Sequence, residues 1–286
     1  MKTISLLVVA VAVFSASAAS ADGSPWLPIP KSGALSLSYV SEDAETFYRG
    51  EENRDLPFGG LEQQSIYLNA NYGLTDSIAL DVQAVHTSVS GDAPSPPGPP
   101  DEDGWADIRV GATWRFVDEY VNPAAPSVAL RVGYTVAGDY TSTLPTAIGD
   151  GADALEASLV FGKIFDNRFA LSVEWGYRSR SDDVPNESFI NAKAFVLVGE
   201  RWILNAQIHK TTASGNLDIG GQGFTPARFA ETSEDIERFG LGAEFNVTPD
   251  IGLGLNWFKV TDGRNTAEFD TIAATVSYKF DLYGAG

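Results

Sequence analysis

The sequence predicts an all-β protein, an antiparallel up-and-down transmembrane β-barrel of about 12 strands. Apolar residues recur at every second position from about Gly33 onward, which is the period of a β-strand and not of a helix. No apolar run reaches the roughly 18 residues that a membrane-spanning helix requires. Short turns alternate with long polar segments along the chain, as they do in bacterial outer-membrane barrels.

The N-terminus shows the regions of a secretory signal peptide in their usual order. Lys2 is followed by an apolar run from Ile4 to Phe14 and then by small residues that end at Ala21, after which we place the cleavage. The chain is therefore expected to divide into four parts. These are a signal peptide, 1–21; an N-terminal periplasmic or lumenal segment, 22–33; the transmembrane barrel, 34–280; and a C-terminal tail, 281–286.

The composition narrows the possible functions. There is no cysteine, so disulfides, thiol chemistry and cysteine metal sites are excluded. Of the 19 basic residues, Lys2 leaves with the signal peptide, so 18 basic side chains face 38 acidic ones. Nucleic acid is excluded as a partner by this acidic balance, because phosphate binding requires clustered Lys and Arg.

Twelve segments carry the strand alternation, although ten or fourteen strands also fit the pattern. In the segment from Ala106 to Phe116, for example, apolar residues alternate with Asp107, Arg109 and other polar residues or glycine. Single-chain bacterial barrels have an even number of strands. The segments are centred near residues 38, 69, 82, 110, 132, 159, 174, 194, 206, 242, 256 and 275.

The connections between these segments alternate in length. In outer-membrane barrels the short turns are periplasmic and the long loops are extracellular, so the two classes predict the orientation. The turn at 117–126 is longer than this rule prefers. The short turns are 73–77, 165–168, 199–201 and 248–250, and the long class includes 41–64, 90–104 and 211–236.

The two faces of the strands predict which side meets lipid. One face carries aromatic residues near both strand ends with aliphatic residues between them, as at two membrane interfaces. The other face carries acids and bases that the core of a soluble β-sandwich could not hold without a large desolvation cost. In a polar lumen these charges pair with one another and with water. The charged set is Asp81, Asp107, Glu156, Glu174, Glu244, Arg109, Arg115, Arg131, Arg178, Lys193, Arg238 and Lys279.

Two segments resemble the MetA-pathway of phenol degradation family of outer-membrane transporters. They are Trp26-Leu-Pro-Ile-Pro-Lys-Ser-Gly33 and Gly104-Trp-Ala-Asp107-Ile-Arg-Val-Gly111-Ala-Thr-Trp-Arg115-Phe, in which Ala106 replaces a glycine that is usual in the family. The resemblance implies a barrel that passes small hydrophobic or aromatic compounds. The segment Val276-Ser-Tyr278-Lys-Phe280 is similar to the last strand that the barrel assembly machinery reads, although six residues follow it here.

We expect a barrel in the bacterial outer membrane that acts as a channel or transporter, without cofactor, metal ion or catalysis. The expected partners are outer-membrane lipids, a small-molecule solute and the barrel assembly machinery, and the expected state is a monomer. The sequence names neither the solute nor whether the lumen is open. The residues expected to line the pathway are Asp107, Arg109, Arg115, Arg131, Glu174, Arg178, Lys193, His209, Arg238 and Glu244.

Other interpretations of the same residues remain. Lumenal pairs such as Asp107 with Arg109 could brace the wall and leave no passage, in a barrel with a structural or adhesive role. His86 and Ser88 share the outer face near the loop end of the third strand, where a lipid hydrolase would need them. Spacing identifies no acidic or amide residue to orient this histidine, so an interfacial histidine is the favoured interpretation.

Metal binding is the weaker interpretation of the remaining polar residues. A lone His209 is more often a hydrogen-bonded structural residue than a ligand. The acidic runs at 42–45, 51–52 and 101–103 could hold Ca²⁺ or Mg²⁺ through carboxylate oxygens. None of them reproduces a complete ligand loop, so solvated loop charge is favoured.

Overall fold

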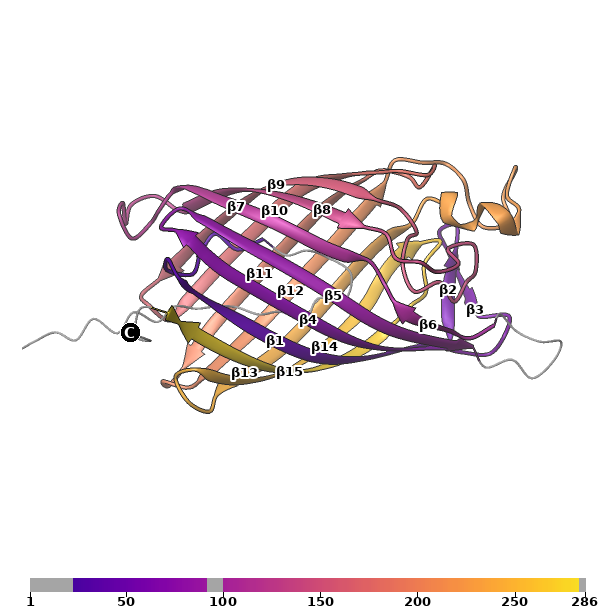
Figure 1. The fold of residues 1–286 in the computed structure, drawn as a ribbon. Helices are drawn as coiled ribbons and strands as arrows, with labels where there is room; N and C mark the ends of the chain where they lie inside the picture. Colours follow the sequence, from indigo (N-terminus) through magenta and orange to yellow (C-terminus); the bar gives the residue numbers. More distant parts are fainter. Residues whose placement is uncertain (1–22, 92–99, 283–286) are drawn as a thin grey trace, which may run out of the picture.

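A computed structural model describes residues 23–91 and 100–282, so the predicted signal peptide lies outside the described residues. The chain forms a closed antiparallel barrel of 12 strands, which confirms the predicted fold class (Figure 1). Each predicted segment centre falls within one strand. The wall consists of β1 (Ser32–Ala44), β4 (Leu61–Thr75), β5 (Ile78–Gly91), β6 (Glu102–Trp105) with β7 (Ile108–Val117), β8 (Ser127–Val136), β9 (Ala154–Phe165), β10 (Phe169–Arg180), β11 (Glu187–Val198), β12 (Trp202–Ala213), β13 (Asp235–Asn246), β14 (Ile251–Arg264) and β15 (Asp270–Asp281).

The first and last strands close the barrel. β1 pairs with β15 from Ser32 opposite Asp281 to Asp43 opposite Asp270, so the long edges of the sheet hydrogen-bond to each other. β6 and β7 both pair with β5 and together form one strand that is interrupted at residues 106–107. Closure satisfies backbone N–H and C=O groups that hydrocarbon cannot hydrogen-bond.

The two ends of the barrel differ as the loop lengths predict. Tight turns join β4 to β5, β9 to β10, β11 to β12 and β13 to β14 at one end, on the left in Figure 1. The opposite end carries the hairpin of β2 (Thr46–Arg49) and β3 (Glu52–Asp55) and a 3₁₀ turn over Pro226–Glu231. The extracellular end is therefore the one with the hairpin and the 3₁₀ turn.

The turn between β9 and β10 shows how the sequence specifies a tight link. Asp166 and Asn167 have positive φ values of 50° and 52°. Consecutive residues with positive φ match the right-handed twist of the flanking strands, and Asp and Asn tolerate this conformation better than other non-glycine residues.

The outer surface of the barrel is apolar and carries aromatic residues at two levels. Trp114 and Trp202 lie beside the short turns and are 52% and 47% exposed, while Trp175 lies toward the loops and is 57% exposed. Exposed aromatic residues at two levels, with aliphatic side chains between them, fit the two interfaces of a membrane. No helix among the described residues is long and apolar enough to cross a membrane.

The N-terminal segment, residues 23–31, lies against the inner wall near the short turns. Trp26 is 9% exposed and packs edge-on against Phe195 of β11, with the ring centroids 6.4 Å apart. Its Nε1 donates a hydrogen bond of 2.7 Å to Oε1 of Glu119. Glu119 lies in the connection between β7 and β8, so this long turn holds the segment in the lumen.

Candidate functional site

A ladder of ion pairs runs around the inner wall from β5 to β11. Arg131 Nη2 lies 2.7 Å from Asp81 Oδ2, and its Nη1 lies 2.6 Å from Glu156 Oε1. Arg178 Nη2 lies 2.7 Å from the other oxygen of Glu156, and its Nη1 pairs with Glu187. Each arginine therefore bridges two acidic side chains, and the ladder braces neighbouring strands against one another.

Glycines beside Arg131, one on β7 and one two residues along β8, make room for its guanidinium group. A Cβ atom at Gly111 would lie 2.4 Å from Nη2 of Arg131, and one at Gly133 would lie 2.9 Å from Nη1. Both approaches are closer than a real Cβ atom tolerates, so side chains at these positions would displace the arginine. Glycine at these two positions of β7 and β8 therefore leaves the space that the buried guanidinium group of Arg131 occupies.

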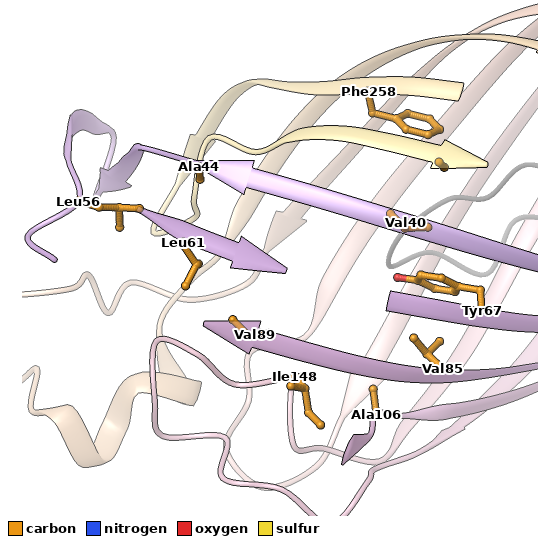
Figure 2. Packing of buried hydrophobic residues seen from close by; sticks show 11 residues of the cluster. Val40, Ala44, Leu56, Leu61, Tyr67, Val85, Val89, Ala106, Ile148 and Phe258 are labelled. Carbon is orange, nitrogen blue, oxygen red and sulfur yellow. The ribbon is translucent and has the colours of Figure 1, made fainter. Parts of the chain in front are cut away.

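A cavity of about 450 Å³ lies in the extracellular half of the lumen. Its apolar side is formed by inward-facing residues of β4 and β5, by Ala106, by Leu56 from the β1–β4 connection and by Ile148 from the β8–β9 connection (Figure 2). A cavity of this size and character suits a small molecule with an apolar body. The residues on this side are Leu56, Leu61, Tyr67, Val85, Val89, Ala106 and Ile148.

Polar and charged side chains line the cavity across from these residues, together with apolar ones such as Ile236 and Val260. Arg178, Glu187, His209 and Arg238 line it from β10 to β13, which the strand order places across the barrel from β4 and β5. Arg109 lines it from β7. The cavity therefore offers an apolar surface and a hydrogen-bonding surface to the same ligand.

The predicted pathway residues separate into two groups. Five of the ten line the cavity, namely Asp107, Arg109, Arg178, His209 and Arg238. The other five lie elsewhere in the barrel: Arg115 pairs with Asp118 beside the short turns, Arg131 belongs to the ion-pair ladder, Glu174 contacts the N-terminal segment, and Lys193 and Glu244 occupy β11 and β13.

Asp107 anchors the connection between β8 and β9 as well as lining the cavity. Its Oδ1 accepts hydrogen bonds from the Tyr140 hydroxyl and, at 3.1 Å, from the Gly138 N–H. The Tyr140 oxygen in turn accepts a bond of 2.7 Å from the Gly151 N–H. Burial and the Asp107 carboxylate raise the pKa of Tyr140, which keeps the phenol neutral as a donor.

Asn265 joins three extracellular connections above the cavity. Its Nδ2 donates to Asp218 Oδ1 at 2.9 Å and to the Ser233 carbonyl at 2.8 Å, both in the β12–β13 connection. Its Oδ1 accepts from the N–H groups of Ile219 at 3.0 Å and of Gly50, beside the β2–β3 hairpin, at 2.9 Å. Asn265 is 5% exposed. Its side chain holds together the β2–β3 hairpin and the β12–β13 and β14–β15 connections, which we call the cover of the cavity.

Sequence reasoning missed the apolar side of the cavity. The alternation was used to place charges inward, yet Val85 and Val89 also occupy inward positions and are 7% and 1% exposed. Their signal is visible in β5, because valines occupy two of its last inward positions, on either side of Thr87, while the middle of the strand carries the inward Asp81 and Gln83. The loop residues that complete the cavity have no periodic pattern that could have identified them.

Glu234 is a further missed residue, and it predicts a pH dependence. Burial, together with the nearby Asp150 carboxylate, raises the pKa of this cavity-lining carboxyl from 4.5 to about 7. Because the pKa is raised in the folded state, the stabilising effect of the proton is complete below pH 4.5 and is lost as the pH rises through 7. The cavity gains a negative charge over the same range.

We expect the preference of the barrel for cations over anions to increase between pH 6 and pH 8, as carboxylate forms at Glu234. Reversal potentials in a salt gradient across a planar bilayer measure this preference. The variant Glu234→Gln should show a flatter pH response in that range. An unchanged response in the variant would assign the titration to another group.

The structure supplies a neighbour for His86 that spacing did not identify. Asp103 Oδ1 lies 3.9 Å from His86 Nδ1, and β6 places Asp103 directly opposite Ser88 of β5. The separation exceeds a hydrogen bond. The imidazole packs edge-on against Trp105, with centroids 5.4 Å apart, among the outer-face aromatic residues. This environment is that of an interfacial histidine.

The acidic runs do not form a recognisable metal centre in the part of the chain that the structure describes. No group of three or more His, Asp or Glu side chains there is placed to hold a metal ion. Glu42, the first residue of one run, instead faces the lumen and accepts hydrogen bonds from Thr271 and Gln63.

A closed 12-strand barrel with an apolar outer surface and a charged lumen defines a β-barrel of the bacterial outer membrane. The chain belongs to the family described as "Putative MetA-pathway of phenol degradation", which matches residues 53–276. This match confirms the resemblance identified from the sequence. No curated protein matches the chain.

Solved structures share the fold at low sequence identity. The COG4313 outer membrane channel from Pseudomonas putida F1 has a TM-score of 0.72 and 15% identity, covering 91% of this chain and 100% of that one. The KdgM porin in complex with disordered oligogalacturonate has a TM-score of 0.51 and 6% identity, covering 86% and 99%. The NanC porin has a TM-score of 0.50 and 9% identity, covering 86% and 100%. At these identities the comparisons establish the architecture.

Proposed function

We propose that the protein is an outer-membrane channel for small molecules with an apolar, often aromatic, body and a polar group. The observation that carries this proposal is the cavity, because it combines a cluster of apolar side chains with charged and hydrogen-bonding groups in the extracellular half of the lumen. Membership of a family described by phenol degradation supports an aromatic solute. The fold shared with outer membrane channels supports transport as the role of the barrel.

The contacts within the cavity suggest how such a solute binds. The apolar body would pack against Val85, Val89 and Ile148, where burial of apolar surface provides affinity. The polar group would lie toward His209 and Arg238 on the other side. Arginines of the ladder would shape the bore and act on a solute through their field, since Arg131 and Arg178 already bridge acidic partners.

The alternatives account for fewer of these features. A purely structural or adhesive barrel has no use for a cavity of about 450 Å³ that its own loops help to line. A lipid hydrolase would use the outer face, where His86 and Asp103 are 3.9 Å apart and outside hydrogen-bonding distance. We therefore propose no catalytic role. A monomer, inserted by the barrel assembly machinery and surrounded by outer-membrane lipids, is sufficient for the proposed transport.

The proposal is tested by filling the cavity. Ala147 lines it from the β8–β9 connection, so Ala147→Trp should occupy the volume that the solute needs and remove most of the uptake of phenol into proteoliposomes. The matched control is Ala124→Trp, which adds the same side chain at an exposed position of the turn between β7 and β8. Equal uptake by the two variants, or no uptake by the unmodified protein, would refute the proposed function.

A further inference from the structure

Three polar residues form a row across the inner wall between the cavity and the N-terminal segment. Glu174 of β10 lies directly opposite Asn191 of β11, and Asn191 lies directly opposite His209 of β12. His209 lines the cavity. Glu174 is 2% exposed and Asn191 is 4% exposed. The row therefore runs along the inner wall of the barrel, perpendicular to the strands.

The hydrogen bonds along this row have a defined direction. Asn191 Nδ2 donates to Glu174 Oε2 at 3.0 Å, which leaves Oδ1 of the same amide as an acceptor. His209 Nδ1 contacts that Oδ1, so Nδ1 must carry the proton of the imidazole. His209 therefore donates to Asn191, and Asn191 donates to Glu174. Rotation of the His209 ring would remove the N–H group that fixes the orientation of the Asn191 amide.

The far end of the row holds the N-terminal segment. Gly23 N–H donates to Glu174 Oε2 at 2.9 Å, while the other carboxylate oxygen accepts a bond of 2.6 Å from the Ser158 hydroxyl. A Cβ atom at Gly23 would lie 2.7 Å from Val160 Cγ2 and 2.8 Å from Glu174 Oε1. The fit therefore requires glycine, and Gly23 occupies a site shaped to its backbone.

The segment has a second attachment of a different kind. Trp26, three residues along, combines its hydrogen bond to Glu119 with packing against Phe195. An aromatic side chain buried in a cluster with Ala170 and Ile203 is held more strongly than a backbone N–H on one carboxylate. The Trp26 end is therefore the fixed attachment, and the Gly23 end is the one that can be released.

We propose that His209, Asn191 and Glu174 couple the cavity to the N-terminal segment, so that a solute that turns the His209 ring releases Gly23 from the wall. The three are positioning residues. Loss of the His209 donor lets the Asn191 amide turn its oxygen toward Glu174 Oε2, and the repulsion between the two oxygens moves Oε2 away from the Gly23 N–H while Ser158 still holds Oε1. The coupling from His209 to Gly23, which we call the link, is argued from the hydrogen bonds. The movement of His209 by a solute, which we call the trigger, rests on the proposed function of the cavity.

The link is tested with two substitutions that add the same charge. Asn191→Asp places a carboxylate against Glu174 and should release Gly23, whereas Asn205→Asp adds its charge on the inner wall of β12, where Asn205 contacts Asn256. The chain lacks cysteine, so Ser24→Cys gives a single thiol beside Gly23. A charged thiol reagent should label this cysteine about tenfold faster with Asn191→Asp, as expected for loss of one buried hydrogen bond to a charged group. Asn205→Asp should leave the rate unchanged.

Equal labelling rates in the two variants would overturn the link. If Asn191→Asp does not fold, as judged by heat-modifiable mobility on gels, His209→Phe carries the same test because it removes the donor at the start of the row, with His86→Phe on the outer face as its control. The trigger is tested by adding phenol to the Ser24→Cys protein. Labelling should accelerate, and His209→Phe should abolish the acceleration. If phenol is transported without accelerating labelling, the trigger is wrong and the channel stands. If the Asn191→Asp result holds but no uptake occurs, the proposed function is wrong and the link stands.

Discussion

Replacement of Arg131 by methionine is expected to lower the free energy of unfolding by about 3 kcal/mol. Arg131 is 1% exposed, and its guanidinium group bridges Asp81 and Glu156. Methionine fills part of the volume but leaves Asp81 without this cation. Glu156 keeps its bond to Arg178, so the loss should lie at the lower end of the range for breaking a buried ion pair. Urea titration of the folded fraction in lipid vesicles measures the change.

The control for this substitution is Arg201→Met. Arg201 lies in the exposed turn between β11 and β12, where substitutions change stability by less than about 0.5 kcal/mol. If Arg131→Met were no more destabilising than this control, the ladder would contribute nothing to stability. The inward arginines would then be available for another role.

Asn265→Ala is expected to open the cover of the cavity while leaving the barrel wall folded. The substitution removes the five side-chain hydrogen bonds to the β12–β13 connection and to Gly50. It also places alanine at a φ of 53°, a left-handed conformation that asparagine tolerates better. We expect the free energy of local opening to fall by about 2–3 kcal/mol. Protease cleavage within the β12–β13 connection of the folded protein should accelerate accordingly.

Asn265→Gly separates the two causes. Glycine adopts the positive φ without strain but has no side chain, so its effect isolates the lost hydrogen bonds. We expect it to be about 1 kcal/mol less severe than the alanine variant. Cleavage rates equal to that of the unmodified protein in both variants would show that the cover is held by other contacts, such as that between Arg264 and Asp218.

The wall of the barrel was predictable because strand geometry is local. A period of two assigns each residue to a face, so the inward position of Arg131 and the outward position of Trp114 follow from counting along one strand. The charge pattern then determines which face meets lipid. The partners of Arg131 were less accessible, because register across β5, β8 and β9 decides which of the inward acids it reaches.

The cover and the N-terminal attachment were not predictable from the sequence. Asn265 lies 215 residues from Gly50 and 46 from Ile219, and nothing in its local sequence indicates that it joins them. The contact between His86 and Asp103 was not predictable either, because the two residues are distant in the sequence. They lie close together because β6 pairs with β5 across a long connection. Contacts between irregular segments depend on the completed fold and have no sequence period.

The attachment of Trp26 also sets an order of events during folding. The residues that receive it come later in the chain, with Glu119 93 positions beyond it and Phe195 on the eighth strand of the wall. Contacts so distant in sequence form late, because closing long loops is entropically costly. The N-terminal segment is synthesised first among the described residues, yet it is expected to dock among the last. A partly assembled barrel would therefore pass through a stage in which this segment does not yet occupy the lumen.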